Sequence, residues 1–150
     1  MIRIIPATVD DLPEILQLQL LAYQSEARLL GNLDIPPLKQ TLDDLHAEFD
    51  NGVFLKAVDD DLIVGSVRGR RADGTTYVSK LIVHPDHQGQ GIGTRLLAQI
   101  ESTLPAEHYE LFTSDQSLRN LALYDRIGYR QIRTEEVTPT LRLVYLRKTG

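Results

Sequence analysis

Three glycines between a strand-like segment and a helix-like segment constrain the fold of this chain more than any other feature. Residues 75–83 form the expected strand, and Gly89, Gly91 and Gly93 follow in a polar loop. Beyond the loop, apolar residues recur at helical spacing: Ile92, Leu96, Leu97, Ile100 and Leu104. Glycine lets the main chain approach a bulky anion, and the first N–H groups of a helix lack internal partners. The segment therefore predicts a strand–loop–helix unit whose loop binds a pyrophosphate through main-chain N–H groups.

Two other glycine-rich nucleotide motifs do not fit this loop. A P-loop ends in Gly-Lys-Ser/Thr, whereas Gly93 is followed by Thr94 and Arg95. A dinucleotide fingerprint needs glycine at its first, third and sixth positions, and the sixth position counted from Gly89 is Thr94. The remaining alternative for the segment taken alone is a helix start that tolerates glycines and binds nothing.

The N-terminal third of the chain predicts one strand and two helices. A short strand is expected around Ile2, and Thr8 is the expected cap of a helix that has Pro13 in its first turn. The apolar face of this helix is expected to comprise Leu16, Leu18, Leu20, Leu21 and Ala22. A break is expected over residues 31–37, and Thr41 begins the second helix with an acid three residues later.

The rest of the chain predicts a mixed sheet. Strands are expected at 53–58, 62–70 and 75–83, joined by turns at 59–61 and 72–74 into an antiparallel meander. The glycine loop and its helix are followed by a strand at 109–113, a helix with Leu118, Leu121, Ala122 and Ile127 on one face, and strands near 129–133 and 141–147. This order predicts an α/β fold of the α+β kind, with a central, mostly antiparallel sheet flanked by helices. Because the chain has no repeat or long linker, residues 1–150 are expected to form a single domain.

Composition and charge narrow the function classes. The chain has no cysteine, which excludes disulfides, thiolate metal sites and a catalytic thiol, and it has no apolar run of the roughly 18–20 residues that a membrane span needs. We therefore expect a cytoplasmic protein without a membrane partner. The net charge of −5 and the scattered basic residues disfavour nucleic-acid binding and weakly favour a cationic substrate such as an amine. His84 and His87 flank Asp86, but they lack a clear third ligand, so no metal is predicted.

Two motifs together resemble one enzyme family. The run Gln88-Gly89-Gln90-Gly91-Ile92-Gly93 is similar to the Gln/Arg-x-x-Gly-x-Gly/Ala motif of the Gcn5-related N-acetyltransferases, the GNAT family, on the expected strand–loop–helix unit. About 25 residues later, the run from Asn120 to Tyr129 resembles the second element of that family, Asn-x-x-x-x-Tyr-x-x-x-Gly-Tyr/Phe. The order of strands and helices also agrees. The resemblance implies the GNAT fold and acetyl-coenzyme A (acetyl-CoA) as co-substrate, without a metal.

The resemblance also implies which residues hold the coenzyme. The backbone of Leu81, Ile82 and Val83 would pair with the pantetheine arm like an added strand, which requires the sheet to splay beside it. The pyrophosphate would be held by the N–H groups of Gln88, Gly89, Gln90, Gly91, Ile92, Gly93 and Thr94. Asn120 would contact the pantetheine and Arg126 the distal coenzyme. The alternatives are a plain buried strand for residues 81–83 and a solvated helix face for Arg126.

The chemistry implied is attack of an amine on a thioester, which needs a base for the amine proton and an acid for the departing thiolate. The resemblance makes Tyr124 the expected acid, with a core tyrosine as the alternative. Glu26 is our first choice for the base, and His84, Glu110 and a relayed water remain open; a surface carboxylate is the alternative for Glu26. Ser79 and Lys80 stand where many relatives place a carboxylate, so this sequence departs from the family there.

The function expected from these features is transfer of acetyl from acetyl-CoA to a primary amine of a small molecule or protein, by direct attack in a ternary complex. The alternative is a non-catalytic sensor that binds acyl-CoA. The partner expected is a small-molecule or peptide amine. The resemblance also suggests a homodimer, because exposed last strands in this family commonly pair between subunits.

Overall fold

The structure is a computed structural model that describes residues 1–31 and 35–150, so residues 32–34 of the predicted break lie outside the described residues. The helical elements are α1 (Leu12–Leu30), α2 (Leu42–Asp50), α3 (Ile92–Thr103) and α4 (Leu118–Arg126), with short 3-10 turns at Val9–Asp11, Pro36–Leu38 and Pro85–His87. The strands are β1 (Ile2–Pro6), β2 (Val53–Asp59), β3 (Leu62–Ala72), β4 (Thr75–Val83), β5 (His108–Ser114), β6 (Arg130–Thr138) and β7 (Leu141–Thr149).

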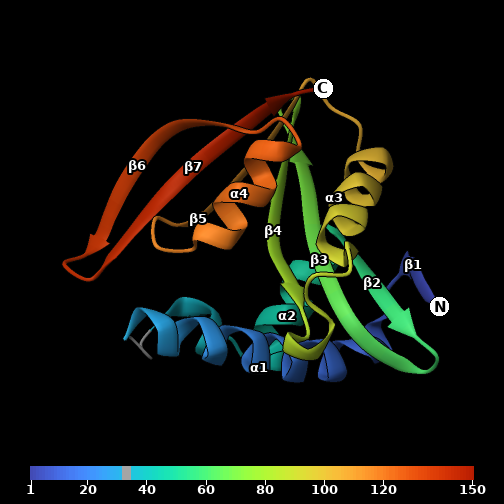
Figure 1. Cartoon of the computed structure of the whole chain (residues 1–150). Helices are drawn as coiled ribbons and strands as arrows, with labels where there is room; N and C mark the ends of the chain where they lie inside the picture. The colour runs from blue at the N-terminus through green and yellow to red at the C-terminus, as the bar shows by residue number, and fades with distance from the viewer. Residues whose placement is uncertain (32–34) are drawn as a thin grey trace.

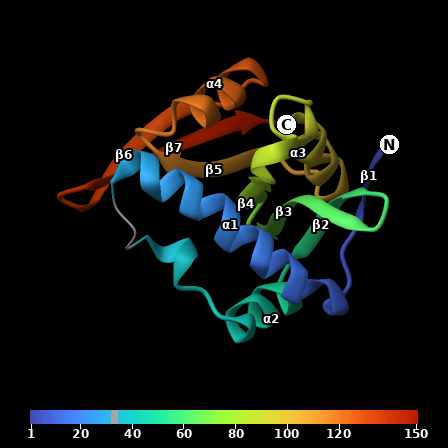
Figure 2. The same cartoon turned by 60° about the horizontal axis from the view of Figure 1, so that its bottom comes forward.

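The seven strands form one mixed sheet in the order β1-β2-β3-β4-β5-β7-β6. Every neighbouring pair is antiparallel except β4 and β5, which run parallel. Helices α1 and α2 lie on one face of the sheet and α3 and α4 on the other, as Figures 1 and 2 show. The predicted fold, a mostly antiparallel mixed sheet flanked by helices, is confirmed.

The turns of the meander follow the predicted chemistry. Asp60 adopts φ 54° between β2 and β3, and Asp73 and Gly74 adopt φ 51° and 79° between β3 and β4. Positive φ in short hairpin connections matches the right-handed twist of the flanking strands, and aspartate and glycine tolerate it best. Both turns therefore lie where the sequence places them.

The larger part of the core lies between the sheet and α3. Ile92, Leu96, Leu97 and Ile100 are buried along one side of this helix, as their spacing predicts. They pack on β2, β3 and β4 and on Leu111 and Val144 from the C-terminal strands. A second cluster lies beneath α1 and α2 and includes Leu12, Ile15, Leu45 and Phe54.

The predicted apolar face of α1 is confirmed in part: Leu18 is buried and Leu16 and Ala22 pack against the core, but Leu21 does not. The helix buries Leu12, Ile15 and Leu18 together with Ala27, whereas Leu21 is 42% exposed. A side chain at i recurs on the same face at i+3, i+4 and i+7, so the set from Leu16 to Ala22 mixes two faces. The buried face also carries a polar residue, Gln19, which is fully buried.

The predicted apolar face of α4 is likewise only partly buried. Leu118 is 74% exposed and Ala122 is exposed, whereas Leu121 is partly buried and Tyr124 is buried. Tyr124 lies one turn beyond Leu121 and therefore shares its face. The helix has only nine residues, and its first residue projects away from the core.

The last two strands are longer than predicted and form a hairpin at the edge of the sheet. β7 lies between β5 and β6, and all nine residues of β6 are exposed. In Figure 1 this hairpin extends away from the rest of the sheet, above the C-terminal end of α1.

The packing of α3 gives the first prediction. Ile100→Ala should lower the free energy of unfolding by about 2–5 kcal/mol, because it leaves a cavity at a fully buried position between α3 and the sheet. Leu62→Ala, at a position that is 66% exposed, is the control and should change it by less than about 0.5 kcal/mol. Urea unfolding followed by circular dichroism would measure both. Equal losses in the two variants would contradict the described core.

Candidate functional site

The parallel strands β4 and β5 separate after a short region of pairing. Only Thr75, Thr76 and Tyr77 pair with β5, opposite His108 to Glu110. Beyond Tyr77, β4 continues to Val83 without a partner on its β5 side among the described residues, and Figure 1 shows the two strands diverging. Leu81, Ile82 and Val83 lie on this open part of β4. The separation of strands that pairing of residues 81–83 with a pantetheine arm would require is therefore present.

A bulge shapes the open part of β4. Ser66 pairs with Ile82 while Arg68 pairs with Ser79, so two residues of β4, Lys80 and Leu81, stand opposite one residue of β3. Lys80 adopts φ 53°, a conformation that lysine rarely adopts. A bulge bends its strand and redirects side chains, and bulges are frequent next to functional sites.

The glycine loop connects the open end of β4 to α3. Gly89 and Gly91 adopt φ 81° and 80°, and Gly91 is the N-terminal cap of the helix. A Cβ atom placed on Gly91 would meet no atom within 4 Å. Gly93 differs, because a Cβ there would touch side chains of Leu123, Leu81 and Val83, the closest at 3.4 Å. Gly91 thus supplies a positive φ beside open space at the helix start, whereas Gly93 allows α3 to lie close to α4 and β4.

An arginine that the sequence reading did not single out lies beside this loop. Arg119, in the first turn of α4, donates a hydrogen bond from Nη1 to Oε1 of Gln88 at 2.6 Å. Its Nη2 would lie 3.8 Å from a Cβ on Gly89. A guanidinium group is a strong ligand for phosphate oxygens. Sequence spacing gave no sign of this contact, because Arg119 and Gln88 belong to separate elements 31 positions apart.

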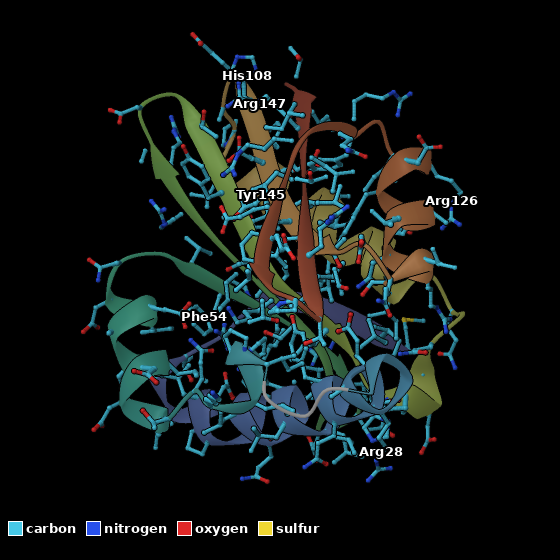
Figure 3. All side chains as sticks on the ribbon, turned by 90° about the vertical axis from the view of Figure 1, so that its left-hand side faces the viewer. Arg28, Phe54, His108, Arg126, Tyr145 and Arg147 are labelled. Atoms are coloured by element: carbon cyan, nitrogen blue, oxygen red, sulfur yellow. The ribbon has the colours of Figure 1, made fainter. Side chains whose placement is uncertain are left out.

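The three predicted residues of α4 lie in different surroundings. Tyr124 is 4% exposed and packs edge-on against Tyr129, with ring centroids 6.0 Å apart. Asn120 is partly buried, and Arg126 is exposed on the outer side of the helix, where Figure 3 shows it pointing away from the sheet. Burial raises the pKa of Tyr124 well above its ordinary value, and the nearby Tyr23 and Glu26 raise it further. The phenol therefore keeps its proton at neutral pH.

Helix α1 brings Glu26 to the same region. The helix crosses the molecule beneath the diverging ends of β4 and β5 (Figure 1). The Glu26 carboxylate accepts a hydrogen bond from the Ser117 hydroxyl, which immediately precedes α4. The charge of Glu26 contributes to the raised pKa of both Tyr23 and Tyr124. The structure thus brings together the two residues that the sequence reading proposed as acid and base, from positions 98 residues apart.

The other candidate bases are placed differently. Glu110 forms an ion pair with Arg147, with 3.0 Å between Oε1 and Nη2. His84 follows β4, and its Nδ1 accepts a hydrogen bond from the main-chain N–H of Asp86 at 3.1 Å. The rings of His84 and His87 lie edge-on at 5.5 Å. Over residues 1–31 and 35–150, no group of three or more histidine, cysteine or acidic side chains is arranged to hold a metal ion.

A pocket of about 600 Å³ lies on the α2 side of the splay. Ser79 and Lys80 of β4 and Phe112 of β5 line its inner part, beside the point where the two strands separate. The end of α2 and strands β3, β6 and β7 contribute its other walls; in Figure 3, Tyr145 and Arg147 lie on this face, and Phe54 lies toward α2. The pocket and the glycine loop therefore lie beside the same gap.

A buried polar network supports one wall of this pocket. Arg68 is 4% exposed, and its Nη1 donates to Oε2 of Glu48 at 2.8 Å while its other terminal nitrogen donates to Gln19. Gln19 in turn donates to the carbonyl oxygen of Pro37 at 2.9 Å and to Gln40 at 2.8 Å. The network ties α1, α2 and β3 to the segment that contains the adjacent prolines.

Comparison with known proteins decides the family. The sequence profile of the acetyltransferase (GNAT) family matches residues 12–129. The chain belongs to the GNAT family.

Solved GNAT structures share the fold over the full chain. The PaiA N-acetyltransferase of Thermoplasma acidophilum, in complex with coenzyme A, superposes with a TM-score of 0.83 at 16% identity, covering 100% of this chain and 99% of that one. The ribosomal-protein-S18-alanine N-acetyltransferase of Escherichia coli has a TM-score of 0.82 at 15% identity, covering 99% and 94%. The yncA structure from Salmonella typhimurium, with its cofactor acetyl-CoA, has a TM-score of 0.75 at 18% identity, covering 99% and 93%.

A curated sequence relative is longer than this GNAT chain. The UPF0157 protein YqkA of Bacillus subtilis is 28% identical over 131 residues, which are 87% of this chain and 38% of that protein. The chain thus spans a little over a third of the length of this curated relative. Among the described residues, no helix has the length and hydrophobicity to cross a membrane.

The burial of Tyr124 gives the second prediction. Tyr124→Phe should leave unchanged the phenolate absorbance that develops near pH 10 in the native protein, because burial holds the pKa of Tyr124 above that range. In denaturant the variant should show one ionising tyrosine fewer than the six of the wild type. Spectrophotometric titration would measure both, and a smaller native signal near pH 10 would contradict the buried environment.

Proposed function

We propose that this protein is an acetyl-CoA-dependent N-acetyltransferase that acts on a primary amine of a small molecule or protein by direct attack in a ternary complex. The observation that carries the proposal is the gap between β4 and β5, with the main-chain N–H groups of a glycine-rich helix start at its end. The coenzyme A and acetyl-CoA complexes of proteins with the same fold support it.

The described residues fit the coenzyme. The unpaired edge at Leu81, Ile82 and Val83 would offer main-chain groups to the pantetheine arm, and the N–H groups from Gln88 to Thr94 would hold the pyrophosphate beside the open space at Gly91. Arg119 adds a positive charge beside that space, so it joins the ligands that the family resemblance implies. Asn120 and Arg126 remain proposed contacts of the pantetheine and of the distal coenzyme.

Tyr124 and Glu26 each carry out one proton transfer in the proposed reaction. Acetyl-CoA supplies the acyl group, and the amine nitrogen forms the new bond to the carbonyl carbon as the bond to sulfur breaks. Glu26 accepts the proton that the amine loses. Tyr124 keeps its proton at neutral pH and donates it toward the departing sulfur.

We also propose a cellular location, a range of partners and an oligomeric state. We place the protein in the cytoplasm with no nucleic-acid or membrane partner, and we propose that it forms a homodimer. The support for the dimer is β6, the last strand of the sheet, whose nine residues are all exposed and which offers an edge for a second copy.

Release of free thiol from acetyl-CoA with a panel of amines tests the proposal. We expect turnover with at least one class of amine, together with stoichiometric binding of coenzyme A measured by calorimetry. Binding without turnover on any amine would instead identify a sensor of acyl-CoA. Absence of binding would overturn both readings.

The loop conformation gives the third prediction. Gly91→Ala should weaken coenzyme A binding roughly tenfold or more, because a main-chain hydrogen bond to a charged group is worth about 1.5–3 kcal/mol and alanine disfavours φ 80°. Gly31→Ala is a matched control, since Gly31 also has positive φ and open space around it but caps α1. Both variants should lose similar stability, and only Gly91→Ala should lose affinity by calorimetry. Equal affinities would refute the role of the loop.

The catalytic pair gives the fourth prediction. Tyr124→Phe should lower kcat by about 100-fold or more, because it removes the proton donor. Glu26→Gln should lower kcat/KM and flatten the acidic limb of its pH profile. Tyr109→Phe and Glu107→Gln are matched controls, because Tyr109 bonds to main chain at the end of α3 and Glu107 is exposed. An unchanged pH profile for Glu26→Gln would exclude Glu26 as the base.

A further inference from the structure

The pocket beside the splay has a charge opposite to that of the whole chain. The sequence has a net charge of −5, yet the pocket is lined by four basic side chains and two acidic ones: Arg68, Arg70, Lys80, Arg133, Glu48 and Glu110. Both carboxylates are already engaged in ion pairs with arginines. Arg133 is paired with Glu135 at 3.4 Å, so Arg70 and Lys80 are the basic groups of the pocket that no described carboxylate neutralises.

Lys80 is the more buried of these two groups. It lies at the bulge of β4, where the strand leaves β5, and it has no hydrogen bond or ion pair among the described residues. Burial lowers the pKa of Lys80; Glu48 raises it in part, and Arg68 lowers it further. Glu48 accepts hydrogen bonds from Arg68 and Gln40, and among the described residues it forms no ion pair with Lys80. A half-buried ammonium group in this position is stabilised by an anion that enters the pocket.

Two arginines of the pocket, Arg70 and the paired Arg133, lie on aromatic rings. Arg70 lies over Tyr77 at 4.7 Å, and Arg133 lies over Tyr145 at 3.6 Å, measured from the guanidinium carbon to the ring centroid. Phe112 packs on Tyr145 with ring centroids 5.3 Å apart and is 46% exposed. The pocket thus combines cations with an apolar aromatic surface. A bare cationic amine gains nothing from these charges, whereas an amine with an anionic group and an apolar body matches them.

We propose that the acceptor is a small amine that also carries a compact anion, such as a carboxylate or a phosphonate, and that Lys80 binds this anion. An amino acid is the simplest member of this class. The proposal rests on the proposed acetyltransferase function and identifies its substrate class. It also reverses the expectation from net charge, because the field in a pocket is set by the nearest groups, and charges beyond about 10 Å are screened by salt.

The fifth prediction compares acceptors that differ only in the anion. Amino acids would be assayed beside their amides, their decarboxylated amines and the corresponding aminophosphonates, with kcat/KM measured by thiol release. The wild type should prefer the anionic acceptors over the neutral ones by about 10-fold to 100-fold, the range expected for a hydrogen bond between charged groups. The carboxylate and phosphonate series show which anion the pocket prefers.

Variants test the role of Lys80. Lys80→Met should bring the ratio of kcat/KM for anionic acceptors to kcat/KM for neutral acceptors close to one. Lys80→Arg should retain most of the wild-type preference for the anionic acceptors. Arg70→Gln, at an exposed position, should reduce the same ratio several-fold. This variant provides a second test if substitution of the half-buried Lys80 impairs folding. Arg3→Met is the control, because it removes one positive charge from β1 at the opposite edge of the sheet.

The outcomes separate this proposal from the proposed function. Turnover of neutral or cationic amines with no preference for an anion would overturn the substrate class while leaving the acetyltransferase activity in place. An unchanged ratio in Lys80→Met, with the fold intact by circular dichroism, would overturn the role of Lys80. Absence of turnover on every amine, with coenzyme A bound, would overturn the proposed function itself.

Discussion

The separation of β4 from β5 after three paired residues is the constraint on which the rest of the structure depends. Main-chain N–H and C=O groups inside a sheet need hydrogen-bond partners, and here neither strand is free to close the gap. β5 is paired along its whole length with β7, and β4 is held by β3 on both sides of its bulge. The gap is thus a fixed opening in a hydrogen-bonded scaffold, and a ligand that pairs with its edge completes the sheet.

The groups around this opening come from distant parts of the chain. The glycine loop and α4 approach it from one face of the sheet, and α1 and the basic pocket lie on the other. In the proposed reaction the donor and the acceptor would therefore enter from opposite faces and meet where the strands part. Tyr124 and Glu26 lie near this meeting point because α1 crosses beneath the diverging strands and Ser117 joins it to the start of α4.

The acceptor side owes its shape to polar residues in the interior. Gln19 occupies a position on the buried face of α1 where a periodic pattern would place an apolar residue. Arg68 of β3 donates a hydrogen bond to its side chain. With Glu48 they hold α2 and the proline segment against the sheet. Buried charge is costly unless it is paired, so the bonds of Arg68 to Glu48 and Gln19 favour one position of this wall. Glu48 thus pairs with Arg68, and Lys80 has no ion pair among the described residues.

The sequence by itself determined the elements and the glycine loop. Turn residues such as Asp73 and Gly74, the helical spacing from Ile92 to Ile100, and the two family motifs are local patterns, and local patterns are read directly from the chain. Only the tertiary structure decided which face of α1 and α4 is buried, that Arg119 lies beside Gln88, and that the basic side chains gather in one pocket. These features depend on contacts between residues far apart in sequence, and such contacts are set by packing of the whole sheet and its helices, which no local pattern encodes.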